Sequence, residues 1–593
     1  MVANLNALTQ TRFGRLTAAE TNLLQNSLVG KLAISGPNNN LNDAANDPAN
    51  AHNWGQNRSI RGELIAWLCT DREASQLVHH SGIQIMGAVI TGPIELVSVP
   101  IQFPLVFASC KLSDDIVLQS ARTRTLSFTQ THIESIIADG LNLSGAFFMR
   151  ECNAGRLQFS GARIEGQFDC YKSKFQLLLM DGATVGVGLL LRDADGTAKM
   201  SGARIATDFD CGGARFTATG FTSGCALDAE GAKVEGSIFL RAGFRAFGLV
   251  KLLGAQVGMN LDCTGGEFND PGGTTIGGEV LRGDSIVVKG TVFLSAGFRA
   301  RGAVHFTSAQ IGGDFNCHHA TFETGLTIER ANIQGAFFWR NVTMAETAGL
   351  DIINTSVDAL SDDSASWPLD GLLECHGFSY KRIGLLSPRT ATERLAWLGR
   401  QKSFAAQPYQ QIASVLKDEG DDRGARQVLY EMERLRRSTE IGLAWLWNSV
   451  LRFVIGYGYR PWRALGLFIV LVLSGSLLFS CGFYAGNMVP TDSGAYSSFR
   501  DKNLLPNHYE RFHTIVYSLE NSLPLFKLGQ VDRWQPDPAV RVFDDHSYSM
   551  TFRILLQLIS PTFLRCYRWF QVLLGWFLAT LWIGGVTGLI RRD

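Results

Sequence analysis

The sequence predicts a mainly β solenoid with helical caps, followed by a helical hairpin and two transmembrane helices. Three observations lead to this architecture. A motif recurs nine times between Leu141 and Trp339, about every 20 to 23 residues with two wider gaps, as expected for stacked coils with a shared core. Residues 390–437 have helical periodicity. Two uncharged stretches, Ala464–Met488 and Trp569–Ile590, each reach the roughly 20 apolar residues that cross a bilayer.

Residues 1–57 are predicted to form a short helix and a flexible linker. Thr17 to Glu20 is a capping-box pattern before two leucines, which marks the start of a helix. Gly36 to Asn53 is rich in Asn, Ala, Asp and Pro, a composition typical of a flexible segment. Residues 58–82 are then predicted to be a helical N-terminal cap, because an open terminal coil would expose strand edges.

The β-solenoid is predicted over residues 83–360. Each copy of its motif reads roughly small–x–aliphatic–x–small–x–apolar–x–apolar, and side chains of a strand alternate between core and surface. The third position is aliphatic in all nine copies: Leu143, Ile164, Val185, Ile205, Val234, Val257, Val288, Ile311 and Ile333.

The nine copies end in two alternating ways, so the sequence repeats every two coils. One set carries Asp or Asn before a cysteine, at Asp169-Cys170, Asp210-Cys211, Asp262-Cys263 and Asn316-Cys317. The other set carries an aromatic or aliphatic residue, usually with an arginine two residues later. The four cysteines are predicted to pack in the core, since one thiol per two coils is too sparse for a tetrahedral metal site.

The alternating residues that point outward are the candidate interaction surface. Two interpretations remain open. Asp and Arg on neighbouring coils could form ion pairs that hold the coils in register, each pair contributing little. Alternatively, the row of aromatic and Arg side chains could bind a protein partner. The candidate residues are Phe148, Arg150, Asp169, Arg192, Asp210, Phe239, Arg241, Asp262, Phe293, Phe338 and Arg340.

Residues 361–389 are predicted to be an exit loop, and residues 390–460 a cytoplasmic helical linker. A break at Gly420 to Arg423 separates two helical segments and indicates an antiparallel hairpin. Residues 461–593 are predicted to be a membrane domain, with transmembrane helices at 464–486 and 569–590 and an external loop at 487–568. Arg460 and Arg463 precede the first span and Arg591 follows the second, which places both termini and the solenoid in the cytoplasm.

The loop between the spans contains an apolar stretch, Phe512 to Phe526, that could re-enter the membrane as a short helix. Helix, short helix, helix is the layout of two-span tetrameric cation channels. The following Lys527 to Arg533 lacks the run of filter carbonyls of potassium channels. An external subdomain and an oligomeric pore without potassium selectivity therefore both remain open. The candidate re-entrant residues are Tyr517, Glu520, Asn521 and Pro524.

Composition and motifs argue against several functional classes. Lys plus Arg and Asp plus Glu balance at 54 each, so no bulk charge attracts nucleic acid. The 11 cysteines contain no CxxC pair, and no dinucleotide, haem, iron–sulfur or nucleophile-elbow motif is visible. The sequence predicts no catalytic residue, no cofactor and no metal.

Two resemblances follow from these residues. The solenoid is similar to the pentapeptide-repeat class, whose four-sided coils take about 20 residues. The whole chain resembles a family of uncharacterised bacterial membrane proteins, some labelled membrane-associated oxidoreductase, which implies a two-pass protein of the bacterial inner membrane. The matching stretches are Arg58–Leu68, Gly87–Pro93, Ser366–Pro368, Gln407–Ile412, Gly456–Pro461 and Gly575–Arg592.

The function predicted first is a non-catalytic, membrane-anchored cytoplasmic scaffold whose solenoid binds a protein partner. The alternative is an oligomeric two-span pore or effector that the solenoid gates, formed by several copies of the chain in contact with membrane lipids. A second alternative is the oxidoreductase that the family label suggests, which the motifs do not support.

Overall fold

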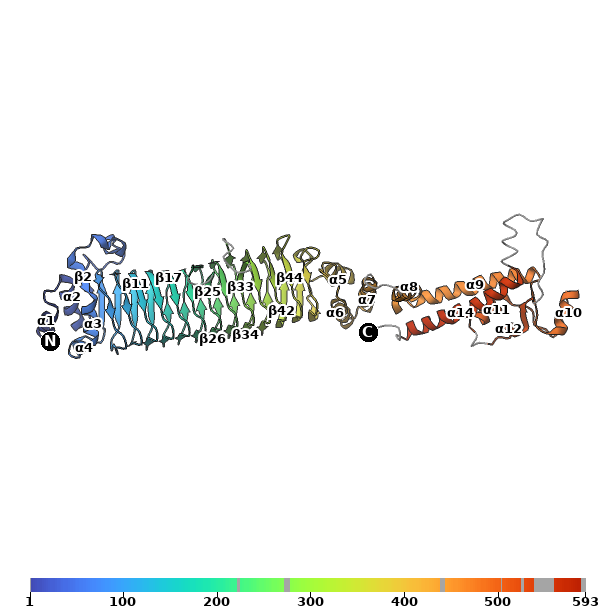
Figure 1. Cartoon of the computed structure of the whole chain (residues 1–593), viewed down its shortest axis with the longest axis horizontal. Helices are drawn as coiled ribbons and strands as arrows, with labels where there is room; N and C mark the ends of the chain where they lie inside the picture. Colours follow the sequence, from blue (N-terminus) through green and yellow to red (C-terminus); the bar gives the residue numbers. More distant parts are fainter. Residues whose placement is uncertain are drawn as a thin grey trace. The chain divides into compact units, whose positions relative to one another are not determined.

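The computed structural model describes residues 2–220, 224–270, 278–437, 443–502, 504–523, 527–537 and 559–587. The chain divides into two compact units, Met1–Gly424 and Ala425–Asp593. The first unit contains a parallel β-solenoid of about 13 coils between residues 83 and 383, which confirms the predicted fold class (Figure 1).

Each coil contributes short strands to four columns, and the strands of a column pair in parallel with the coil before and after. The first column comprises β9 (Arg122–Thr123), β12 (Asn142–Leu143), β15 (Arg163–Ile164), β18 (Thr184–Val185), β22 (Arg204–Ile205), β26 (Lys233–Val234), β30 (Gln256–Val257), β34 (Val287–Val288) and β38 (Gln310–Ile311). The second comprises β3 (Ile83–Met86), β6 (Leu105–Ala108), β10 (Leu126–Thr129), β13 (Phe147–Arg150), β16 (Phe168–Asp169), β19 (Leu189–Leu190), β23 (Phe209–Asp210), β27 (Ile238–Phe239), β31 (Leu261–Asp262), β35 (Val292–Phe293) and β39 (Phe315–Asn316). Both columns continue through β42 (Asn332–Trp339) and β45 (Ser356–Asp362).

The third and fourth columns form the other sheet. Their strands β11 (His132–Ile137), β14 (Asn153–Gln158) and β17 (Lys174–Leu179) run through both columns. The third column otherwise comprises β4 (Val89–Thr91), β7 (Lys111–Leu112), β20 (Asp195–Gly196), β24 (Arg215–Thr217), β28 (Arg245–Phe247), β32 (Glu267–Asn269), β36 (Arg299–Ala300), β40 (Thr321–Phe322) and β43 (Thr343–Met344). The fourth comprises β5 (Ile94–Glu95), β8 (Ile116–Val117), β21 (Ala198–Lys199), β25 (Cys225–Asp228), β29 (Leu249–Lys251), β33 (Glu279–Arg282), β37 (Ala303–His305), β41 (Gly325–Thr327), β44 (Gly349–Asp351) and β46 (Leu373–Glu374).

Helices close the N-terminal end of the solenoid. They are α1 (Val2–Phe13), α2 (Ala18–Val29), α3 (Gly62–Thr70) and α4 (Ala74–Leu77), with the edge strands β1 (Ala33–Ile34) and β2 (Ser59–Arg61). The expected capping box is present: Thr17 and Glu20 exchange hydrogen bonds at the start of α2. The range predicted to be a flexible linker instead contains two 3₁₀ helices, η1 (Ala44–Asn46) and η2 (Pro48–Asn53). The side chains of Asp43 and Asp47 cap them, which explains why a polar segment adopts ordered turns.

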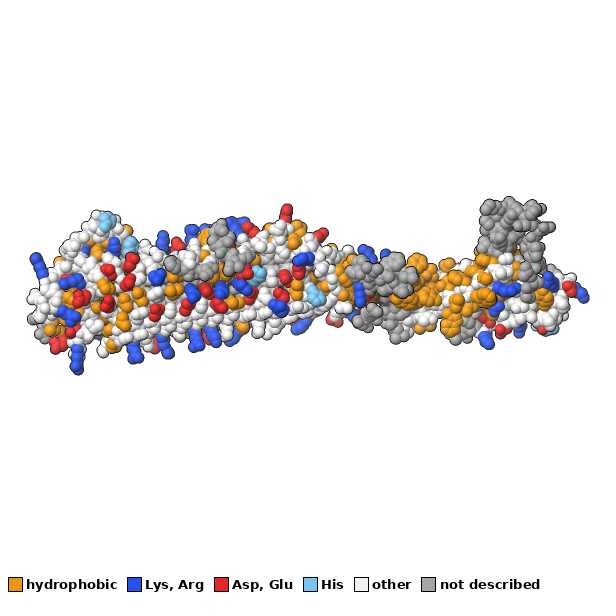
Figure 2. Space-filling model, viewed as in Figure 1, with side chains coloured by type: hydrophobic (Ala, Val, Ile, Leu, Met, Phe, Trp, Pro, Cys, Tyr) orange, Lys and Arg blue, Asp and Glu red, His pale blue; other side chains and the backbone are white. Residues whose placement is uncertain are grey.

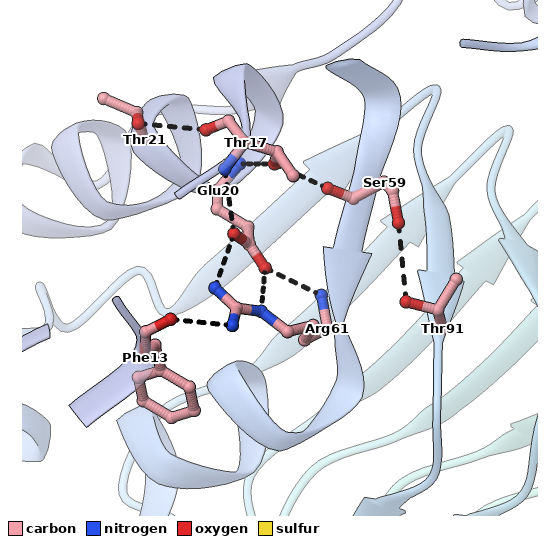
Figure 3. A network of polar contacts seen from close by, with 7 residues as sticks. All are labelled: Phe13, Thr17, Glu20, Thr21, Ser59, Arg61 and Thr91. Carbon is pink, nitrogen blue, oxygen red and sulfur yellow. Dashed lines mark hydrogen bonds and ion pairs between the residues drawn. The ribbon is translucent and has the colours of Figure 1, made fainter. Parts of the chain in front are cut away.

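A buried carboxylate joins α2 to β2 (Figure 3). Glu20 is fully buried. Its oxygens accept hydrogen bonds from Arg61 Nε at 2.7 Å, Arg61 Nη2 at 2.9 Å, Arg61 N at 3.1 Å and Thr17 N at 3.0 Å. Arg61 Nη1 also donates to the carbonyl of Phe13, and Thr17 Oγ1 donates to that of Ser59. The side chains of Glu20 and Arg61 together therefore link the end of α1, the start of α2 and β2.

The solenoid extends beyond the predicted end at residue 360. The range expected to be an exit loop contains β46 and β47 (Ser379–Ile383), which continue two of the columns. Leu373, Tyr380 and Ile383 are buried in the same way as the inward residues of earlier coils. The motif is too degenerate in this last coil to be recognised in the sequence.

Helical side chains close the C-terminal end. Arg394 of α5 (Ala391–Leu398) forms a bidentate, fully buried pair with Asp362 of β45, with both N–O distances at 2.7 Å. Gln407 and Gln411 of α6 (Gln407–Asp418) donate to the carbonyls of Phe378 and Tyr380 on the last coil. These amides take the place of a further strand and cover the edge. After a turn at Gly420, helix α7 (Asp422–Arg437) begins.

The second unit contains two helices that are long and apolar enough to span a membrane, α9 (Trp462–Tyr484) and α14 (Pro561–Val586). Figure 2 shows hydrophobic side chains gathered over this unit on the face in view. The unit also contains α8 (Leu443–Ile455), η7 (Gly456–Gly458), α10 (Ser493–Lys502), α11 (Thr514–Ser522), α12 (Gln530–Arg533), and the antiparallel strands β48 (Met488–Pro490) and β49 (Trp534–Pro536).

Helix α14 begins eight residues before the span predicted at 569–590, inside the predicted external loop. Its first turns contain two arginines with polar partners: Arg565 donates to the carbonyl of Asp537, and Arg568 to Asn521 Oδ1. Charged residues whose side chains have polar partners can lie inside a long apolar helix. The length of the uncharged stretch alone therefore does not predict where such a helix begins. Residues 588–590 of the predicted span lie outside the described residues.

The Glu20 network predicts that the N-terminal cap loosens in acid. Burial alone would raise the pKa of Glu20, but hydrogen bonds from Arg61 and from the backbone of Thr17 outweigh it and hold the pKa below its ordinary 4.5. A lowered folded-state pKa means that this stabilisation is present above about pH 4.5 and is lost as pH falls through the folded value. We expect Glu20→Gln to reduce the free energy of opening of α2 and β2 by about 1–3 kcal/mol at pH 7, and by less at pH 3.

Hydrogen exchange of the α2 and β2 amides in the full chain measures this difference. Glu63→Gln, which changes an exposed carboxylate in the first turn of α3, is the matched control. Equal effects of the two substitutions at pH 7 would contradict the prediction.

Candidate functional site

The predicted outward residues form one continuous column on the second face of the solenoid. Consecutive Cα partners along this column are Phe148, Asp169, Leu190, Asp210, Phe239, Asp262, Phe293, Asn316 and Phe338. We call this set the outward column. Its aromatic residues are half-buried, because the residues above and below in the column cover part of each ring.

Three arginines of the candidate surface form ion pairs with aspartates of the outward column. Arg150 reaches Asp169 at 2.7 Å, Arg192 reaches Asp210 at 3.8 Å and Arg241 reaches Asp262 at 2.9 Å. In each pair the arginine lies one coil before the aspartate. The guanidinium groups of Arg150 and Arg241 also lie over the rings of Phe148 and Phe239. These contacts occupy the Arg and Phe side chains that would have to bind a protein partner. They favour the interpretation in which ion pairs hold the coils in register.

The acidic residues of the outward column have a second role that sequence reasoning missed. The second carboxylate oxygen accepts a backbone N–H two residues later: Tyr171 N to Asp169 Oδ1, Gly212 N to Asp210 Oδ1 and Thr264 N to Asp262 Oδ1, all within 3.0 Å. Asn316 accepts from His318 N in the same way at 2.9 Å. Each bond stabilises the corner turn that leaves the second face. The residue three positions after each acceptor has a positive φ, and it is glycine only at Gly213 and Gly265, so the sequence signal is an Asp or Asn at the end of the strand.

Alternation on the surface matches an alternation of size in the core. The third face contains a chain of rings, Phe216–Phe244–Phe268–Phe298–Phe322, with neighbouring centroids 5.2–5.9 Å apart. Its members alternate between the two inward positions of the face, so that Phe216 stacks on Ala246 and Phe268 on Ala300. The cysteines follow the same rule, since Cys211 and Cys263 lie between Leu191, Leu240 and Leu294 and are fully buried. The core-packing role predicted for them agrees with this arrangement.

A polar groove on the third face is a feature that the sequence did not reveal. It has a volume of about 660 Å³ and crosses β7, β11, β14 and β17. Lys111, His132, Asn153 and Lys174 stack in register along one side. On the floor, a Cβ at Gly155 would lie 2.3 Å from the carbonyl oxygen of Glu134, so this strand can approach its neighbour only with glycine there.

The side chains along the groove contrast with the outward column. Within the described part of the chain, those of Lys111, His132, Glu134 and Lys174 form no hydrogen bond or ion pair. Burial lowers the pKa of His132 and the carboxylate of Asp47 opposes this shift, so that the imidazole is mainly neutral at pH 7. The groove is therefore a hollow with unused donors and acceptors, which suits a polar ligand.

In the second unit, the predicted re-entrant segment forms helix α11 and packs against both apolar helices. Ser518 Oγ donates to the carbonyl of Val472, near the middle of α9. Gln571 of α14 donates to Ser518 Oγ at 2.6 Å and to Ser522 Oγ at 3.0 Å. A Cβ at Gly475 would lie 2.5 Å from Gln571 Nε2. Small residues thus let three helices meet around one buried amide.

The four candidate re-entrant residues differ in their burial and in their contacts. Tyr517 is fully buried and packs on Phe479 and Phe512. Glu520 accepts four backbone N–H groups of residues 528–531, which fixes the chain after the helix. Asn521 accepts from Arg568. Pro524 lies outside the described residues.

Comparison with known proteins identifies no relative. The chain matches no protein-family model, no curated protein and no solved structure. The architecture of the resemblance, a β-solenoid with two apolar helices, is present, and the family assignment itself stays a prediction.

The double role of Asp262 predicts that its shape matters more than its charge. Asp262→Ala removes the acceptor of Thr264 N and the partner of Arg241, and we expect a loss of about 1–3 kcal/mol in local stability. Asp262→Asn keeps the amide oxygen, as Asn316 does two coils later, and should cost less than about 1 kcal/mol. Hydrogen exchange across residues 261–268 measures both losses. Equal losses for the two variants would contradict a turn-stabilising role.

Proposed function

We propose that the chain is a non-catalytic, membrane-anchored scaffold whose cytoplasmic solenoid binds a protein partner in the polar groove. The observation that carries this proposal is the contrast between two faces of one solenoid. The outward column pairs its own charges, whereas the groove offers Lys111, Glu134 and Lys174 without partners among the described residues. A stacked, in-register row of such groups suits an extended segment of a protein, because each coil presents one contact about every 4.8 Å.

Anchoring rests on the two apolar helices. α9 has 23 residues and α14 has 26, which suffices for a bilayer core of about 30 Å. Arg452, Arg460 and Arg463 are exposed around the start of α9, and an excess of arginine on one side favours a cytoplasmic location for that side. The solenoid precedes α9 and would share this location.

The buried thiols of the solenoid support a non-catalytic role over the oxidoreductase alternative. Burial raises the pKa of Cys110 to about 11 and that of Cys152 to about 12, and it raises the pKa of Cys170 well above the ordinary value. Thiols that stay protonated and inaccessible are poor nucleophiles and poor redox groups. Among the described residues, no group of three or more His, Cys, Asp or Glu side chains could hold a metal ion.

A photo-crosslinking residue at Gln176, on the groove, tests the scaffold proposal. Introduced into the full chain in cells, it should give a specific crosslinked partner. Lys111→Glu combined with Lys174→Glu should reduce that product at least about tenfold, because two cations become anions. The same probe at Gln256 or Gln310, exposed on the first face, is the control. Crosslinks that are equal at all three positions, or insensitive to the charge reversal, would reject the groove as the binding surface.

A second candidate function is an oligomeric pore. It is favoured by one observation, the packing of α11 between α9 and α14 at the level of Val472 and Gln571, half-way along a span. A short helix held at that depth is an element that a two-span pore requires. In this function, several copies would surround a conduction path and the solenoid would control it.

A matched pair of glycine substitutions tests the pore. A Cβ at Gly575 would lie 2.3 Å from the carbonyl oxygen of Ser522, whereas a Cβ at Gly466 meets nothing within 4 Å. If the chain conducts ions in liposomes, Gly575→Ala should displace α11 and change the flux severalfold, and Gly466→Ala should not. A monomeric particle in detergent that gives no flux above protein-free liposomes would exclude the pore.

A further inference from the structure

An apolar crevice lies between α9 and α14 beyond the end of α11. Its volume is about 270 Å³. One wall is a stripe of α9 and the other a stripe of α14 at i, i+3, i+4 and i+7, with few polar atoms: Ala464, Leu465 and Phe468, and Trp576, Ala579, Thr580 and Ile583. Trp576 and Ile583 are about half exposed, so the crevice opens sideways rather than into the bundle.

The crevice exists because α11 is short. α11 fills the space beside α9 and α14 as far as Ser522, where its backbone touches Gly575. Beyond Leu523, no described residue fills the space between the two stripes. Val454 and Ile455 of α8 pack against α9 and α14 in a cluster that includes Ala464 and Leu578.

The depth of the crevice places it in a single leaflet. Ala464 and Phe468 are the third and seventh residues of α9, about 3–9 Å from its start at a rise of about 1.5 Å per residue. Ile583 and Trp576 are three and ten residues from the end of α14, about 5–15 Å. Half of a hydrocarbon core is about 15 Å. If α9 and α14 span a bilayer, the crevice faces the acyl chains of the leaflet at the start of α9.

The same end of the helix pair carries exposed cations and an exposed indole. Arg460 and Arg463 are exposed, and within the described residues neither forms an ion pair. Arg460 lies over the ring of Tyr430, which holds its guanidinium at the surface of this unit. Trp462 is 69 % exposed, as expected for a residue at the level of lipid headgroups.

We propose that this crevice binds one acyl chain of an anionic phospholipid, with the phosphate of the lipid against Arg460 and Arg463. Guanidinium groups bind phosphate through paired, charge-assisted hydrogen bonds. An acyl chain matches the apolar walls. A water molecule in the crevice would find few hydrogen-bond partners there. The proposal rests on the proposed membrane anchoring and adds a lipid class and a site to it.

Purified full-length chain in detergent, incubated with phosphatidylglycerol or phosphatidylcholine and examined by native mass spectrometry, tests the proposal. We expect one phosphatidylglycerol to be retained and phosphatidylcholine to be lost. The double substitution Arg460→Gln and Arg463→Gln should lower the affinity for phosphatidylglycerol roughly 30-fold, because each cation contributes a factor of about five. Ala579→Phe fills the crevice and should abolish retention.

Two substitutions outside the crevice serve as controls. Leu573→Phe enlarges an exposed residue of α14, and Arg452→Gln removes an exposed cation of α8. Both should retain the lipid. Equal retention of the two lipids would overturn the proposal, as would a loss of retention in the controls equal to that in the crevice and arginine variants. If Ala579→Phe misfolds, the arginine variants alone test the proposal. Flotation with liposomes distinguishes failure of the membrane anchoring from failure of the lipid site. A chain that does not float contradicts anchoring. A chain that floats without a lipid preference contradicts only the site.

Discussion

Parallel, in-register stacking is the constraint on which the solenoid depends. Because each coil lies directly on the one before, every side chain meets its own equivalent about 4.8 Å away. Stacked large residues or like charges can crowd or repel each other, although the chain does place Phe147 on Phe168 and Arg215 beside Arg245. On the third face the chain alternates large with small, as with Phe268 and Ala300, and the outward column alternates Asp or Asn with Phe or Leu, as with Asp262 and Phe293. The rings of the third face and the corner turns of the outward column therefore share a period of two coils.

Stacking leaves two unpaired ends, and both are closed by polar side chains on helices. At the N-terminal end, Glu20 of α2 accepts the backbone N–H of Arg61 and pairs with its guanidinium. At the other end, Arg394 pairs with Asp362, and the amide of Gln411 takes the place of a strand donor. Backbone groups left without partners at a buried edge would cost more than the ordering of these side chains. The helices thus end the sheet as well as cover the core.

The sequence predicts the coils well where one residue class recurs in place, as in the aliphatic third position from Leu143 to Ile333. The sequence underestimates the length of the solenoid, which continues beyond residue 360. Leu373 and Tyr380 point into the core there, but the residues around them do not match the repeated motif. The groove is not predictable, since its shape depends on the register of four strands and on the close approach at Gly155. The partners of Gln571 and Glu520 are also hidden, because they depend on tertiary contacts between segments far apart in the chain.

The alternation also limits how such a protein can change in length. Within the alternating columns, inserting one coil would set two like residues on each other, such as two phenylalanines on the third face or two aspartates in the outward column. Inserting two restores the original sequence of neighbours at both junctions. The segments Gly236–Phe268 and Gly290–Phe322, which match closely, are related by such a two-coil step. A gene of this kind is therefore expected to grow by duplicating pairs, so that the length of the solenoid changes in steps of about 10 Å.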